Sequence, residues 1–114
     1  MPRNDSLEMG ELTDTSYYIL LALIEPMHGY LIMNKVENMT NNRVSIGPAS
    51  LYTTIKKLVK AGLIELVEEA EKKKKTYVTT EKGIKLIKQE MDRKREMILH
   101  AEEIFTNIGD GNNG

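Results

Sequence analysis

One segment of the chain, residues 47–62, carries helix signals at both of its ends. Pro48 suits a first helical turn, where its missing N–H would have no partner, and Gly62 supplies the left-handed residue that often ends a helix. Between them, apolar residues recur at i, i+4, i+7 and i+8: Leu51, Ile55, Leu58 and Val59. Residues at this spacing share one face of a helix. We therefore expect one amphipathic helix here.

The opposite face of this helix is polar and basic and carries no acid. Its members are Ser50, Thr53, Lys56, Lys57 and Lys60. Short hydroxyls in the first turns suit contacts with DNA base edges, and lysines further along suit contacts with phosphates. An ordinary solvated helix shows the same pattern, so the segment alone leaves both interpretations open.

Charge is distributed unevenly along the chain, although the net charge is only −1. Residues 1–42 hold two basic and six acidic side chains, whereas residues 43–64 hold four basic side chains and no acid. Four consecutive lysines follow at residues 72–75, after a glutamate-rich stretch. Phosphate contacts depend on local charge, so this pattern favours site-specific binding of nucleic acid over indiscriminate coating.

The first 46 residues predict an arm and two short helices. Residues 1–12 show little periodicity and are expected to form the arm, with a short helical piece around residues 7–12. Thr13 or Asp14 can cap the next helix, which Pro26 ends. Its expected buried stripe is Tyr17, Leu20, Leu21 and Ile24. After a break at residues 26–29, a second helix is expected over residues 30–38, buried through Ile32, Met33 and Val36. A loop at residues 39–42 and a very short strand at residues 43–46 follow.

Two further strands complete the predicted DNA-binding domain. Residues 63–68 and 76–80 are rich in β-branched and apolar side chains, and the lysine-rich stretch between them is typical of a hairpin tip. Three helices followed by a two-stranded hairpin form a winged helix-turn-helix. We expect a mainly α fold with a small β-hairpin: arm 1–12, winged helix-turn-helix 13–80, long C-terminal helix 81–108 and tail 109–114.

The last predicted helix, from residue 80 or 81 to about residue 107, is longer than a small domain needs, at about 40 Å. It carries an apolar heptad seam with Lys94 as its one polar member. The seam consists of Ile84, Ile87, Met91, Ile98, Ala101, Phe105 and Ile108. An apolar stripe that projects beyond its domain needs another chain to cover it, which predicts a homodimer. The alternative is that the stripe folds back on its own domain, which is credible for Ile84 and Ile87.

The composition gives no support to an enzyme, a metal site or a cofactor. The chain has no cysteine, and its two histidines, His28 and His100, have no partners at ligand spacing. We expect His28 to help start the second helix. No apolar run approaches a membrane span and no secretory signal opens the chain, so the cytoplasm is the expected compartment.

Four motifs together resemble the PadR family of transcriptional regulators, in its short form with a single C-terminal helix. They are YILLAL followed by PMHGY (residues 18–23 and 26–30), GPASLY (47–52), LVKAGLI (58–64) and TYVTTEKG (76–83). The chain departs from the usual pattern at Ala49, where the family often has Gly, and at Thr79, where an apolar residue is common. The resemblance implies a dimeric repressor that binds a palindromic operator and that a small-molecule effector can release. It also favours a phosphate contact for Tyr52.

These considerations give two sets of site residues. The DNA-binding set is Tyr30, Ser50, Tyr52, Thr53, Lys56, Lys57, Lys60, Lys73, Lys74, Lys75 and Tyr77. The dimerisation set is Tyr17, Met91, Ile98, Ala101, Phe105 and Ile108. The partners expected are therefore double-stranded DNA and a second copy of the chain, with no membrane. The alternative function is a winged-helix protein-interaction module whose basic face binds an acidic partner.

Overall fold

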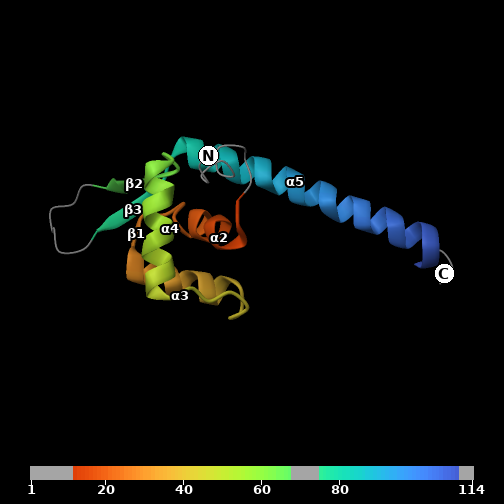
Figure 1. Cartoon of the computed structure of the whole chain (residues 1–114), viewed down its shortest axis with the longest axis horizontal. Coiled ribbons are helices and arrows are strands. Elements are labelled where there is room, and N and C mark those ends of the chain that lie inside the picture. The colour runs from red at the N-terminus through yellow and green to blue at the C-terminus, as the bar shows by residue number, and fades with distance from the viewer. Residues whose placement is uncertain (1–11, 68–74, 111–114) are drawn as a thin grey trace.

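A computed structural model describes residues 12–67 and 75–110 of the chain (Figure 1). Helices α2, α3 and α4 and a small antiparallel sheet form a compact body. Helix α5 begins on this body and continues well beyond it, so that its C-terminal end is far from the sheet. The predicted fold class, mainly helical with a small sheet and a long C-terminal helix, is confirmed. Residues 1–11 of the expected arm 1–12 and residues 68–74 of the expected hairpin lie outside the described residues, whereas Leu12, expected to belong to the arm, is buried in the core.

Helix α2 spans Asp14–Ala22, and Thr13 caps it as expected, since the Thr13 hydroxyl accepts a hydrogen bond from the backbone N–H of Ser16 at 3.1 Å. The predicted buried stripe is wrong in part. Leu20 is buried, but Tyr17 and Leu21 are half-buried and Ile24 is exposed. The helix ends before Leu23, so Leu23 and Ile24 no longer follow the spacing of an α-helix. Leu23 enters the core and Ile24 faces outward.

Helix α3 spans Gly29–Met39, one residue longer at each end than predicted, and it buries Ile32 and Val36 while Met33 is half-buried. Met27–His28, expected to be only a break, forms strand β1. Conversely, residues 43–46 form no strand. The backbone N–H of Val44 instead bonds to the Thr40 hydroxyl at 3.0 Å, so the Thr40 side chain satisfies it in place of a strand partner.

Helix α4 spans Pro48–Lys60, which confirms the helix expected between Gly47 and Gly62. Pro48 lies in the first turn, and Gly62 has a positive φ of 78°. The helix buries Leu51, Ile55 and Leu58 as predicted. Val59, predicted to be buried, is exposed because the core contacts a narrower stripe of α4 than the sequence pattern allows for.

The sheet has three antiparallel strands in the order β1-β3-β2. Strand β2 is Ile64–Val67 and strand β3 is Thr76–Thr79, which confirms the predicted hairpin strands. Strand β1 pairs with the other edge of β3, with Met27 opposite Tyr77. The sheet thereby ties the start of α3 to the hairpin that follows α4.

Helix α5 spans Glu81–Phe105 and is followed by a π-helical turn, η1, at Thr106–Asp110. Thr80 caps its start by accepting a hydrogen bond from the Gly83 N–H at 3.1 Å. Its buried residues are Gly83, Leu86, Ile87 and Glu90. The buried face of α5 is therefore rotated relative to the expected seam. Ile87 belongs to both, but Ile84 and Met91 are only half-buried. Beyond Lys94 every described residue of α5 is exposed.

Candidate nucleic-acid interface

The outer face of α4 lies free at the surface of the body. All the α4 residues in the predicted DNA-binding set are exposed: Ser50, Tyr52, Thr53, Lys56, Lys57 and Lys60. The 13 residues of the helix include no acid, and two of its lysines lie in the last turn, where a positive charge stabilises the helix dipole. The hydroxyls and the lysines of α4 thus form one continuous polar face, as the sequence predicts.

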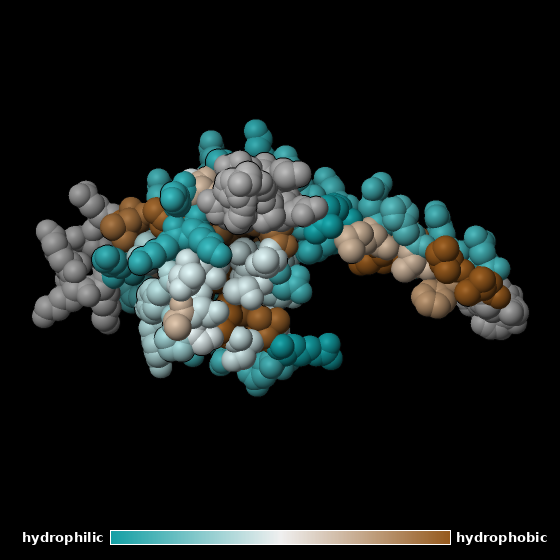
Figure 2. Space-filling model, in the orientation of Figure 1, coloured by the Kyte–Doolittle hydropathy of each residue, from teal (hydrophilic) through white to brown (hydrophobic). Residues whose placement is uncertain are grey.

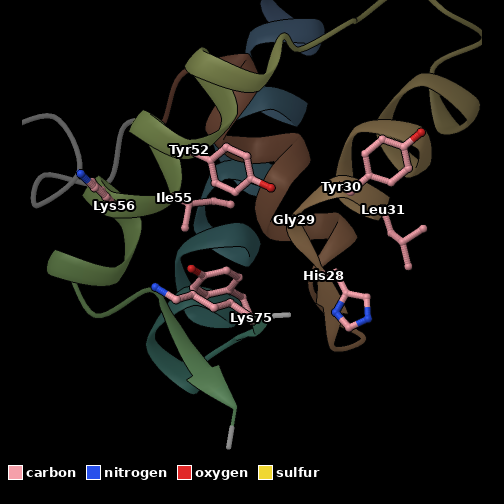
Figure 3. Close-up of a pocket in the computed structure, with 9 residues that line it drawn as sticks. His28, Gly29, Tyr30, Leu31, Tyr52, Ile55, Lys56 and Lys75 are labelled. Atoms are coloured by element: carbon pink, nitrogen blue, oxygen red, sulfur yellow. The ribbon is translucent and has the colours of Figure 1, made fainter. Parts of the chain in front are cut away.

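Beside this face lies a hollow with a volume of about 730 Å³, between the start of α3, helix α4 and strand β3. We call it the tyrosine groove. Its lining residues are His28, Gly29, Tyr30, Leu31, Tyr52, Ile55, Lys56, Lys75 and Tyr77 (Figure 3). The lining holds three tyrosines and two lysines and no acidic side chain. It is therefore suited to a ligand that combines a negative charge with flat or apolar surface.

Tyr52 is positioned in the groove by a glycine on a neighbouring helix. A Cβ atom at Gly29 would lie 2.7 Å from the Tyr52 hydroxyl oxygen and 2.8 Å from a ring carbon. The ring therefore packs against the bare backbone of α3, and Figure 3 shows its hydroxyl turned toward that helix. Because the side chain of Tyr52 is still 46% exposed, it is held in place and accessible at the same time.

Tyr77 lies on β3, half-buried in the wall of the groove. Burial raises the pKa of its hydroxyl above the ordinary value, and the nearby Tyr52 adds to the rise. The side chain accordingly keeps its proton at neutral pH and can donate a hydrogen bond. A neutral donor of this kind suits a phosphate oxygen.

The side chain of His28 connects β1 to β3 rather than capping α3. It is the N-cap residue of α3, but its side chain makes no capping hydrogen bond. Its Nδ1 atom is instead 3.1 Å from the hydroxyl oxygen of Thr76 on β3. The expectation that His28 helps to start the helix is thus wrong for its side chain, which joins β1 to β3.

The other predicted DNA-binding residues that the structure describes line the groove. Tyr30 and Lys75 are exposed in its lining, whereas Lys73 and Lys74 lie outside the described residues. Sequence reasoning missed Gly29, Leu31 and Ile55 as groove residues. Only the PMHGY motif signalled this corner of the fold, since the groove forms from elements that are distant in sequence.

The predicted dimerisation residues fall into two groups. Tyr17 and Met91 are half-buried and pack against the chain's own core. The other four are exposed on the projection beyond the body: Ile98, Ala101 and Phe105 on α5, and Ile108 in η1. Figure 2 shows apolar side chains gathered along one side of this projection and hydrophilic ones along the other. The projecting part of α5 is therefore amphipathic. Its apolar side, which we call the distal face, has no partner within the described residues.

A buried charge lies where α5 leaves the body. The Glu90 side chain has no exposed surface, and its carboxylate accepts hydrogen bonds from Arg93, the shorter at 2.9 Å. The Lys94 ammonium is 3.5 Å from the same carboxylate and 5.0 Å from the centre of the Tyr17 ring. Burial alone would raise the pKa of Glu90, but the hydrogen bonds and charges of Arg93 and Lys94 outweigh it and lower the pKa below its ordinary value.

Within residues 12–67 and 75–110, no three His, Cys, Asp or Glu side chains gather in a way that could hold a metal ion. The helices of the same residues include none with the length and apolarity needed to cross a bilayer.

Comparison with known proteins relates the chain to one family and to several solved structures. Residues 19–89, more than half of the chain, match the model of the transcriptional regulator PadR-like family. A transcriptional regulator from Clostridium thermocellum is 24% identical, with a TM-score of 0.64 over 96% of this chain and 99% of that one. A PadR-like transcription factor from Bacteroides fragilis is 23% identical, with a TM-score of 0.68 over 88% of this chain and 96% of that one.

Another similar structure, Bacillus subtilis PadR in complex with operator DNA, is 24% identical, with a TM-score of 0.59. The alignment covers 69% of this chain and 47% of that one. At identities below 25% these structures demonstrate a shared fold. Among curated protein sequences, none matches the chain.

Proposed function

The chain belongs to the PadR-like family of transcriptional regulators, whose members are DNA-binding proteins without enzymatic activity, and on that premise we propose that it is a dimeric repressor of a palindromic operator. In this proposal residues 13–80 form the DNA-binding domain and residues 81–108 the dimerisation helix. The protein acts in the cytoplasm. A dimer seated on its operator excludes polymerase from the same DNA, and a small-molecule effector releases it.

The observation that carries the proposal is the junction of the acid-free face of α4 with the tyrosine groove. Helix α4 enters the major groove, with Ser50 and Thr53 facing base edges and Lys57 and Lys60 facing phosphates. The tyrosine groove receives the sugar–phosphate backbone beside it. Lys56 and Lys75 supply positive charge from the α4 and β3 sides, and Tyr30, Tyr52 and Tyr77 supply hydroxyl donors. We propose phosphate contacts also for Lys73 and Lys74, which lie outside the described residues.

The distal face of α5 supports the dimer. Met97, Ile98, Ile104, Phe105 and Ile108 are all more than half exposed. Projected at 100° per residue, the four that belong to α5 lie within one arc that continues the buried face of Leu86 and Ile87, and Ile108 follows in η1. Isolated apolar side chains are normal at a surface, but a continuous apolar face of this length marks an interaction site. A second copy of α5 has the matching face.

The proposal is tested by reversing charge on α4. Lys56→Glu combined with Lys57→Glu is measured in a gel shift against a duplex that the wild-type protein has selected from a random-sequence pool. We expect affinity to fall at least about 100-fold, because two phosphate contacts in each chain of the dimer become repulsive. The control variant, Lys85→Glu with Lys88→Glu, makes the same change of net charge on exposed residues of α5 and should shift affinity by less than about fivefold.

Equal affinities for the two double variants would contradict the assignment of α4 as the DNA-reading helix. They would favour the alternative, in which the basic face binds an acidic protein. The salt dependence gives a second readout. The dimer would lose four phosphate contacts, two from each chain, which lowers the steepness of log affinity against log salt concentration by about 4.

A further inference from the structure

The end of α4 and the start of α5 are joined at one corner of the body. The Thr80 hydroxyl donates to the Gly62 carbonyl at 2.7 Å, and the Thr80 N–H donates to the Leu63 carbonyl at 2.9 Å. The Lys82 ammonium donates to the Ala61 carbonyl at 2.8 Å. Three consecutive carbonyls that follow α4 are thus bound by two residues at the beginning of α5.

Close packing accompanies these hydrogen bonds. A Cβ atom at Gly83 would lie 2.3 Å from the Leu63 carbonyl oxygen and 2.6 Å from the Thr79 side chain. The first turn of α5 therefore packs so closely against the chain after α4 that even a methyl group at Gly83 would overlap it. The Lys82 side chain also runs beside Gly62, with its Cδ and Nζ atoms 3.8 Å from the point where a Cβ would lie.

The Lys82 contact serves the C-terminus of α4 in particular. The last carbonyls of a helix have no partner within it, and they carry the negative end of the helix dipole. The Ala61 N–H closes the helix by bonding to the Lys57 carbonyl, whereas the carbonyl of Ala61 itself bonds to Lys82. A positive side chain from α5 therefore both caps α4 and holds its end.

We infer that Lys82 is a positioning residue, which fixes the direction of α4 relative to α5. It thereby sets the distance between the two copies of α4 in the dimer. This inference rests on the proposed dimer. The 13 residues of α4 span about 19 Å at 1.5 Å per residue. A tilt of about 10° at the Lys82 end would move the other end by about 3 Å, nearly the 3.4 Å rise of one DNA base pair.

The test measures distances between the two copies of α4. The chain contains no cysteine, so Thr53→Cys, on the exposed face of α4, accepts a single spin label in each copy. Electron–electron double resonance on the full-length protein then gives the distribution of label-to-label distances. We expect a narrow distribution with Lys82 present and at least a twofold broader one in Lys82→Met, which keeps the aliphatic stem and loses the donor.

Three controls separate positioning from general stability. Lys82→Arg restores a donor and should restore the narrow distribution, whereas Lys85→Met removes an exposed charge on the same helix and should change nothing. A label at Lys88→Cys reports on α5 alone and should give the same width with and without Lys82. Melting temperatures show that all variants are folded at the temperature of labelling.

The outcomes distinguish the two claims. An unchanged width in Lys82→Met, with dipolar coupling present, would overturn the positioning role and leave the dimer standing. The double variant Thr80→Val with Lys82→Met removes a second bond of the corner, and an unchanged width there would overturn the role of the whole corner. Absence of dipolar coupling in the protein with Lys82 would instead contradict the proposed dimer and, with it, this inference.

Discussion

The two halves of α5 differ in what covers them, although one apolar periodicity runs through both. In the proximal half, residues 81–94, Leu86 and Ile87 are buried in the core, and even the charged Glu90 has no exposed surface. In the distal half, residues 95–105, Ile98 is 57% exposed and Phe105 is 64% exposed. The same pattern therefore predicts that a face is apolar without saying which molecule buries it. In the proximal half it is the chain's own body; in the distal half we propose a second chain.

The boundary between the halves falls at Lys94. Its ammonium lies between the Glu90 carboxylate and the Tyr17 ring. This polar residue of the apolar seam therefore has its partners within its own chain. Past it, the helix has left the body and no described residue of α5 is covered. Substitutions on each side of this point should therefore have different effects, on dimerisation in the distal half and on folding stability in the proximal half.

The largest effect is expected from Ile98→Asp combined with Phe105→Asp. Both positions lie on the proposed dimer face, where each carboxylate would have to leave water without a partner. We expect the dissociation constant of the dimer to rise at least about 1000-fold, as measured by sedimentation equilibrium. Leu99→Asp is the matched control, because Leu99 is also exposed but points about 100° away from Ile98. A change for Leu99→Asp as large as for the double variant would contradict the assigned face.

In the proximal half, Gly83→Ala is expected to lower the free energy of unfolding by about 3 kcal/mol, because its methyl group would overlap the Leu63 carbonyl oxygen. Urea denaturation measures the loss. Gly47→Ala provides the comparison, since nothing lies within 4 Å of the Cβ that it adds. Gly47 is the N-cap of α4, where alanine is less favourable than glycine, but alanine also restricts the unfolded chain, so we expect a change below about 1 kcal/mol there. Similar losses in both variants would mean that α5 does not pack as closely on the body as described.

Glu90→Gln should cost about 2 kcal/mol of unfolding free energy, because it leaves a buried amide among cationic partners. Asp92→Asn is the control. Asp92 also pairs with an arginine, Arg95 at 3.0 Å, but both side chains are well exposed, so no measurable change is expected. Chemical denaturation of both variants at neutral pH gives the comparison.

The contribution of Glu90 also depends on pH, with a defined sign. Because its folded pKa lies below its unfolded value, the unfolded state binds the proton more readily. The stabilisation is therefore complete above the ordinary pKa of 4.5 and is lost as the pH falls through the lower folded pKa. The difference in unfolding free energy between wild type and Glu90→Gln should shrink over that range. A difference that grew on acidification would have the wrong sign for this ion-pair cluster.

The smallest effect is expected at the boundary itself. Lys94→Met removes a cation that is one-third exposed, and we expect the body to lose about 0.5 kcal/mol. The dimer should become tighter by a few-fold, because a methionine extends the apolar face. Thermal unfolding and sedimentation together report both changes. Weaker dimerisation of this variant would show that Lys94 contacts the partner rather than only its own body.

The sequence predicted those elements whose signals are local. Helix α4 was predicted nearly to its ends because Pro48 and Gly62 act on the backbone at their own positions. The two strands of the hairpin were predicted because their side chains have strong β propensity. The basic face of α4 follows directly from the spacing of its residues.

Features that depend on contacts between distant segments were missed. Strand β1 has two residues, and only its pairing with Tyr77 and Thr76 makes it a strand. The tyrosine groove requires Gly29 and Tyr52 to meet from different helices. The burial of Glu90 had a weak local signal, in the cations three and four residues later, but only the packing of α5 on the body removes it from solvent.

Sedimentation equilibrium of the full-length chain, alone and with a selected operator duplex, measures whether two chains act together. We expect a particle of twice the 13.0 kDa chain mass in free solution at micromolar concentration, and two chains on each duplex. A monomer in free solution, together with only one chain bound to each duplex, would contradict the proposed dimer. In that case the distal face of α5 would not be covered by a second copy.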